Sequence, residues 1–125
     1  PTVLPKSLQA GRKPFILYGK WMQTATVVLT EDIVSAIKVS HHWGAWSLFG
    51  SEIPSAHIVK LTKLQKIKNI VIWLDADKYE DALNMAAMLE QVRRPDQRVF
   101  VIYTDKDPKE CTDKEIKENV EQYIY

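Results

Sequence analysis

Cysteine is almost absent from this chain of 125 residues, in which Cys111 is the only one. A single thiol excludes an internal disulfide and a zinc site built from several cysteines, and it agrees with a reducing compartment. No apolar run is long enough to cross a membrane, and the N-terminus lacks the apolar core of a signal peptide. We therefore expect a cytoplasmic protein that makes no contact with a membrane.

Net charge is nearly absent as well, because 17 basic residues are matched by 16 acidic ones. A formal charge of +1 creates no global field for nucleic acid, so such binding would need a local basic patch. The 4 glycines form no Gly-rich loop followed by Lys-Ser or Lys-Thr, which excludes a P-loop ATPase. The length is that of a single domain with a core of its own.

Strand-like and helix-like segments alternate four times along the chain. We expect strands, from their β-branched and aromatic residues, at 25–30, 45–49, 69–74 and 98–103. We expect helices, from their apolar periodicity, at 31–40, about 54–65, 79–92 and 112–123. This order predicts an α/β fold with a parallel central sheet of about four strands, flanked by helices on right-handed crossovers.

The ends of the segments carry their own signals. Thr30 is the expected N-cap of the first helix, and a capping box is expected from Thr112 to Glu115 in the last. Residues 1–24 are rich in proline, glycine and basic side chains, and they predict an extended lead-in with a short strand near 15–18. The folded domain is expected at 25–125.

Acidic residues follow three of the expected strands. The apolar segment 70–74 is typical of a strand buried on both faces, and it ends in Asp75 and Asp77. These carboxylates, at positions i and i+2, share one side of the strand and repel each other unless a cation neutralises them. Glu31 follows the first strand, and Asp107, which we favour over Asp105, follows the fourth. Because sites in open parallel sheets form beyond the carboxyl ends of the strands, we expect these four acids to bind Mg²⁺ or Mn²⁺.

The segments that carry these acids resemble the Toprim domain of primases, topoisomerases and some nucleases, and most closely the primase part of phage replicative primases and primase–helicases. The resemblance rests on Val27-Val28-Leu29-Thr30-Glu31, Gly50, Asp75-Ala76-Asp77 and Lys106-Asp107-Pro108. It covers roughly residues 25–120 and implies a Rossmann-like Toprim fold. The chain departs from the family pattern with Asp32 and Glu80 where glycines are usual, and with Ser35 and Lys109 where acids are usual.

This resemblance implies a DNA primase that makes short RNA primers by metal-dependent nucleotidyl transfer. Glu31, Asp75 and Asp77 would be catalytic, and Glu31 would be either a metal ligand or the general base for a 3′-hydroxyl. The implied partners are a single-stranded DNA template, nucleoside triphosphates and other domains of the same primase or helicase, in the cytoplasm of the host cell if a phage encodes the chain.

Two other functions stay open at this point. A stand-alone Toprim nuclease or nicking enzyme would cleave nucleic acid with the metal alone, without triphosphates. A non-catalytic binding module would explain Asp32, Ser35 and Lys109 as marks of lost activity.

Five basic residues are candidates for binding the phosphates of nucleic acid or of a nucleotide. Arg12, Lys13 and Lys20 lie in the lead-in, whereas Lys60 and Lys63 lie on the second expected helix. For the two helical lysines, an ordinary solvated face is the competing interpretation.

Histidines and tryptophans gather between the first helix and the second strand. His41 and His42 stand beside Trp43 and Trp46, yet adjacent histidines lack the spacing of metal ligands, so loop or packing roles are favoured. Trp73 lies inside an apolar strand and is expected in the core.

Overall fold

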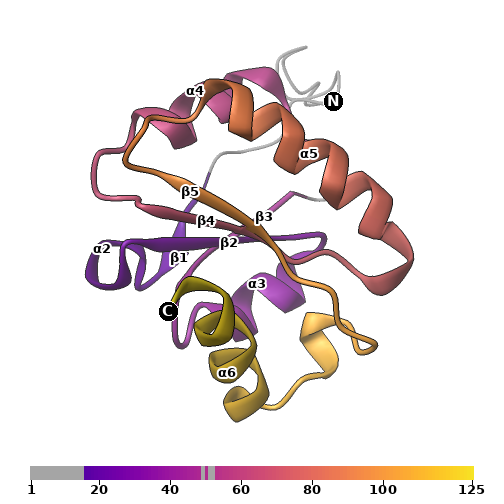
Figure 1. Cartoon of the computed structure of the whole chain (residues 1–125). Coiled ribbons are helices and arrows are strands. Elements are labelled where there is room, and N and C mark those ends of the chain that lie inside the picture. Colours follow the sequence, from indigo (N-terminus) through magenta and orange to yellow (C-terminus); the bar gives the residue numbers. More distant parts are fainter. Residues whose placement is uncertain (1–15, 49, 51–52) are drawn as a thin grey trace, which may run out of the picture.

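The computed structural model describes residues 16–48, 50 and 53–125, and this part of the chain forms a sheet of five strands between two layers of helices (Figure 1). In chain order the strands are β1 (Tyr18–Gly19), β2 (Thr26–Thr30), β3 (Gly44–Ser47), β4 (Asn69–Ile72) and β5 (Arg98–Val101). Their order across the sheet is β1-β3-β2-β4-β5. Strands β2 to β5 are parallel, and β1 pairs antiparallel with β3. The expected α/β fold with a largely parallel sheet is thus confirmed.

Helices α3 (Ile33–Val39) and α6 (Asp113–Ile124) cover one face of the sheet, and α4 (Ser55–Lys63) and α5 (Tyr79–Val92) cover the other (Figure 1). The shorter helical segments are α2 (Trp21–Thr24), η1 (Ala76–Lys78) and η2 (Pro108–Glu110). The chain leaves β2 for β3 through α3, then crosses back through α4 to β4 on the other side of β2. The direction of winding therefore changes between β2 and β4. Within the described ranges, no helix is both long and apolar enough to cross a membrane.

The two central strands are apolar at successive positions because both faces of the sheet are covered. Leu29 and Ile72 pack in the core beneath α4 and α5. Val28, Val71 and Trp73 pack in the second core against α3 and α6. Side chains alternate between the faces of a strand, so a strand covered twice needs apolar residues throughout. The prediction of a doubly buried strand before Asp75 is confirmed, as is the core position of Trp73.

Most element positions agree with the sequence expectations, and the differences occur at the ends. Thr112 forms the expected capping box: its Oγ1 accepts from the N–H of Glu115 at 3.2 Å, and its own N–H donates to Glu115 Oε1 at 3.0 Å. The expected Thr30 cap of α3 was wrong. Strand β2 runs through Thr30, so the helix begins later, and Asp32 Oδ1 accepts from the N–H of Ser35 at 2.8 Å.

Part of the expected lead-in is ordered against the sheet. Strand β1 pairs Tyr18 with Ala45 and Gly19 with Gly44, and α2 follows it directly. The strand expected at 15–18 was placed too early: Ile16 and Leu17 precede the strand, which runs over Tyr18–Gly19. Phe15, Arg12 and Lys13 lie outside the described residues.

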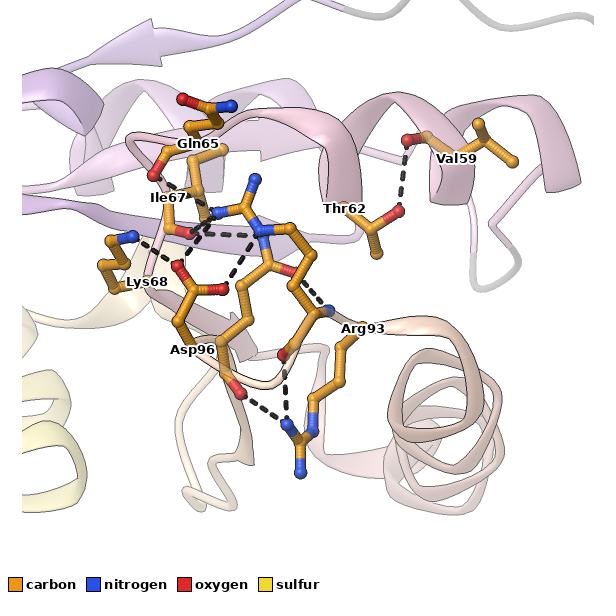
Figure 2. A network of polar contacts seen from close by, with 9 residues as sticks. Val59, Thr62, Gln65, Ile67, Lys68, Arg93 and Asp96 are labelled. Atoms are coloured by element: carbon orange, nitrogen blue, oxygen red, sulfur yellow. Dashed lines mark hydrogen bonds and ion pairs between the residues drawn. The ribbon is translucent and has the colours of Figure 1, made fainter.

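A polar network connects the loop before β5 to the loop before β4, at the amino-terminal ends of these strands (Figure 2). Gln97 is fully buried, and its amide donates to Ile67 O at 3.1 Å and accepts from the N–H of Arg94 at 3.1 Å. Hydrogen bonds from Lys68 and Arg94 lower the pKa of Asp96 to about 2. Both the oxygen and the nitrogen of the buried Gln97 amide therefore have a hydrogen-bond partner, which is typical of a structural role.

We predict that Gln97→Ala lowers the free energy of unfolding by about 2–4 kcal/mol, because it removes buried volume, takes away one of the two donors to Ile67 O and leaves the N–H of Arg94 without its acceptor. Gln65→Ala is the matched control, since Gln65 is exposed and takes part in the same network through its backbone carbonyl. That control should change stability by no more than about 0.5 kcal/mol. Equal effects of the two substitutions in urea denaturation would contradict the structural role of the buried amide.

Candidate metal centre

Three carboxylates meet at the carboxyl ends of the adjacent parallel strands β2 and β4. Glu31 follows β2 directly, and Asp75 follows β4 after two further residues. Leu29 pairs with Ile72, so the two strands end nearly level and deliver their acids to the same place. This place lies at the change of winding direction between β2 and β4, where open α/β sheets leave a crevice for ligands.

One carboxylate oxygen from each of Glu31, Asp75 and Asp77 lies within 4.8 Å of the others. Glu31 and Asp75 are partly buried, whereas Asp77, on the short helix η1, is exposed to solvent. Oxygen atoms at such separations suit a hard divalent cation, bound directly or through a water molecule. The sequence-based expectation that these three acids converge is confirmed.

Two carboxylate oxygens of the cluster lack hydrogen-bond partners within the part of the chain that the structure describes. Glu31 Oε2 and Asp75 Oδ1 are buried, and neither has a hydrogen-bond partner among the described residues. A buried oxygen without a partner costs about 1–3 kcal/mol, and more when it is charged. These two oxygens therefore fit either a bound cation or a proton held between the two carboxyl groups.

The proximity of the acids changes the protonation of Asp75. Burial, together with hydrogen bonding to Glu31 and the charges of Glu31 and Asp107, raises the pKa of Asp75 from 3.8 to about 7. Two adjacent carboxylates repel each other when both are ionised. A proton on one of them, or a cation bound between them, reduces this repulsion. A metal ion bound here would displace that proton near neutral pH.

Asp107 stands beside the three clustered acids and also supports them. It precedes η2, and its Oδ1 accepts from the N–H of Ala76 at 3.4 Å, which connects the η2 loop to η1. The N–H of Asp107 in turn donates to Glu110 Oε1 at 3.1 Å. Asp107 is thus placed next to the site, while its direct coordination of a metal stays a prediction.

Asp32 and Lys109 border the site as an ion pair that sequence reasoning missed. Lys109 Nζ lies 3.1 Å from Asp32 Oδ2, and both residues line an open hollow of about 500 Å³ with Glu31, Ile33, Gly50 and Asp75. Burial alone would raise the pKa of Asp32, but the bonds from Ser35 and Lys109 outweigh it and lower the pKa. Asp32 before Ser35 is a recognisable helix cap, but its pairing with a residue 77 positions away has no local signal in the sequence.

The loop after β3 closes another side of the hollow. The N–H of Gly50 donates to the carbonyl oxygen of Glu31 at 3.0 Å. Gly50 has a φ of 149°, a backbone conformation that residues with side chains rarely adopt. The glycine singled out after the second strand therefore holds the backbone of Glu31.

The predicted phosphate-binding lysines within the described residues lie toward the amino-terminal ends of the parallel strands, away from the acids. Lys20 donates its N–H to Trp43 O just before β3, and Lys60 and Lys63 lie in the last turn of α4, which leads to the start of β4. The structure therefore does not bring them to the acids, and their contact with phosphate stays a prediction.

The other candidates have separate surroundings. Asp105 lines a second hollow of about 430 Å³ with Tyr103, Lys106 and residues of α6. His41 Nδ1 and His42 Nε2 lie 3.7 and 3.8 Å from Asp113 Oδ1, between the loop after α3 and the start of α6.

Comparison with protein-family models, with curated proteins and with solved structures gives no match to this chain.

We predict that Asp75→Asn stabilises the metal-free protein at pH 8 and abolishes its stabilisation by Mg²⁺. The pKa of Asp75 is raised from 3.8 to about 7, so between these values the folded protein keeps a proton that the unfolded chain has lost. The free energy of unfolding of the parent should therefore fall as the pH rises from about 4 to about 7. Asparagine cannot ionise, so the variant should lack this fall.

Thermal denaturation in EDTA and in Mg²⁺, at pH 5 and pH 8, measures both effects. Asp105→Asn is the matched control, because it removes the same charge from the exposed loop after β5, and it should behave as the parent does. A variant Asp75→Asn that is less stable than the parent at pH 8 in EDTA, or that still responds to Mg²⁺, would contradict this description of the site.

Proposed function

We propose that this chain is a Toprim domain of a DNA primase, which joins nucleotides into short RNA primers in a metal-dependent reaction. The observation that supports this proposal most is the convergence of Glu31, Asp75 and Asp77 at the ends of β2 and β4, with two buried carboxylate oxygens that lack partners. The Lys106-Asp107-Pro108 segment, which carries part of the Toprim resemblance, lies beside these acids through the bond from Ala76 to Asp107.

The residues of the site divide into distinct tasks. Glu31 and Asp75, which are partly buried and rigidly placed at strand ends, would hold Mg²⁺ or Mn²⁺, and Asp77 would reach it from the exposed side. The bound cation would supply positive charge for a triphosphate and for the charge that develops at phosphorus. If Glu31 is not a direct ligand, its carboxylate would accept the proton of a primer 3′-hydroxyl. Asp107 would keep η1, and with it Asp77, in position.

An exposed aromatic pair favours a nucleotide over other phosphate esters. Tyr79 begins α5 directly after η1, and Tyr103 follows β5, so both lie toward the carboxyl edge of the sheet. Their ring centroids are 5.0 Å apart at an interplanar angle of 73°, and they are 38% and 53% exposed. Nucleobases stack on exposed aromatic rings without regard to sequence, as binding of a single-stranded template requires.

We predict that Tyr103→Ala weakens the binding of a fluorescent thymidine decamer in saturating Mg²⁺ by roughly 5- to 150-fold, the range of one lost base-stacking contact. Tyr103→Phe keeps the ring and should bind as the parent does. Tyr125→Ala is the control, because Tyr125 is 86% exposed at the end of the chain. Fluorescence anisotropy that finds equal affinities for the parent and Tyr103→Ala would count against the stacking role.

Primer synthesis itself is tested with Mn²⁺, a single-stranded DNA template and labelled nucleoside triphosphates, and the products are resolved on a denaturing gel. We expect short labelled RNA that depends on the template and is lost in the Asp75→Asn/Asp77→Asn double variant, but not in Asp105→Asn. Cleavage of DNA by the metal alone would instead indicate a Toprim nuclease. Manganese binding with neither reaction would indicate a non-catalytic module, and absence of manganese binding would refute metal-dependent chemistry.

A further inference from the structure

Lys109 places a positive charge on the wall of the same hollow that Glu31 and Asp75 line. Its ammonium group pairs with Asp32 at 3.1 Å. Asp32, and then the charges of Asp75 and Asp107, raise the pKa of Lys109, so the ammonium stays charged next to the acids. A cation in this position opposes the binding of a metal ion to Asp75. Without a metal ion, the charge of Lys109 offsets part of the rise in the pKa of Asp75 that burial and Glu31 cause, and Lys109 also presents its charge to the open hollow that both residues line.

The ion pair with Asp32 is not needed to hold the η2 loop on the fold. Lys38, on α3, already donates from its Nζ to the carbonyl oxygens of Lys109 at 3.0 Å and of Cys111 at 2.7 Å. Pro108 and Cys111 are buried on either side of Lys109. The Lys109–Asp32 pair is itself more than one-third exposed, and exposed ion pairs contribute about 0–1 kcal/mol to stability. The ammonium can therefore change its partner at little cost.

We propose that Lys109 forms an anion subsite that binds a phosphate of the nucleotide or nucleic-acid substrate next to the metal, a role that rests on the proposed function. An ammonium group is a suitable point-charge partner for phosphate oxygens. Asp32 occupies that ammonium when no substrate is bound and gives it up when a phosphate enters the hollow. The site then contains two positive charges for the substrate: the cation held by the acids, and Lys109.

Removal of the lysine should shift two affinities in opposite directions. In Lys109→Ala, Mn²⁺ alone should bind about fivefold more tightly, because a like charge has gone from the site. The thymidine decamer, in saturating Mg²⁺, should bind about fivefold more weakly, because a phosphate has lost its partner. Lys109→Arg should restore decamer binding. Titration calorimetry measures the first affinity, and fluorescence anisotropy measures the second.

Asp32→Asn provides the opposite test without disturbing the helix. Asparagine caps a helix as well as aspartate does, so α3 should keep its N-cap. Loss of the Asp32 charge leaves Lys109 available, so the decamer should bind more tightly than it does to the parent and Mn²⁺ more weakly. Lys114→Ala, which removes an 83% exposed lysine from α6, is the control for net charge. Circular dichroism verifies that each variant is folded.

The outcomes separate this inference from the proposed function. If the parent binds Mn²⁺ through Asp75 but Lys109→Ala binds the decamer as the parent does, the anion subsite is refuted and the metal site stands. A loss of decamer binding in Lys114→Ala as large as in Lys109→Ala would also refute it, since net charge would explain both. If the parent binds no Mn²⁺, both proposals fail together.

Discussion

The burial of β2 between two parallel neighbours is the constraint on which the rest of this structure depends. Val28 and Leu29 are fully buried on opposite faces, so each face of the sheet needs its own helical layer. The crossover through α3 and the return through α4 supply these layers from opposite sides. Because of that reversal, no crossover runs directly from β2 to β4, and a crevice is expected between the carboxyl ends of these two strands. The acids lie there.

The same arrangement creates an electrostatic conflict at the end of the sheet. Glu31 and Asp75 follow strands that are paired in register, so their carboxylates lie close together, and this proximity contributes to the raised pKa of Asp75. The network at the amino-terminal ends of β4 and β5 shows the opposite solution, because Gln97, Arg94 and Asp96 satisfy one another there. Among the described residues, most polar groups of that network have partners, although Arg94 Nη1 has none, whereas at the carboxyl ends of the strands two buried oxygens of adjacent acids lack a partner. The second arrangement is the one expected at a functional site.

How far the sequence predicts this structure depends on the range of the interaction involved. Strands β2 and β4 are predictable because a doubly buried strand must be apolar at each position, and α6 because Thr112 and Glu115 form a local capping box. The convergence of Glu31, Asp75 and Asp77 follows from the rule that parallel strands end at one edge. The N-cap of α3 was missed because Thr30 and Asp32 are both good caps, and the length of β2 decides between them.

The pairing of Lys109 with Asp32 could not be predicted, since it depends on how the η2 loop settles on α3. Both residues were visible only as single departures from a family pattern.

If the site binds a metal ion and a phosphate as proposed, its charges would also determine the order in which the two enter. Asp32 and Lys109 form an ion pair, and Lys109 compensates only part of the charge of Glu31, Asp75, Asp77 and Asp107. An anion that arrives first meets the repulsion of these carboxylates, and Lys109 alone is a weak counterweight while it stays paired with Asp32. A cation that arrives first would meet the attraction of the acids and the weaker repulsion of Lys109, and it would reduce the negative field that a phosphate must then cross. If the acids bind a metal ion as proposed, these charges would favour its entry before that of the phosphate, and the exchange of Asp32 for phosphate at Lys109 would follow.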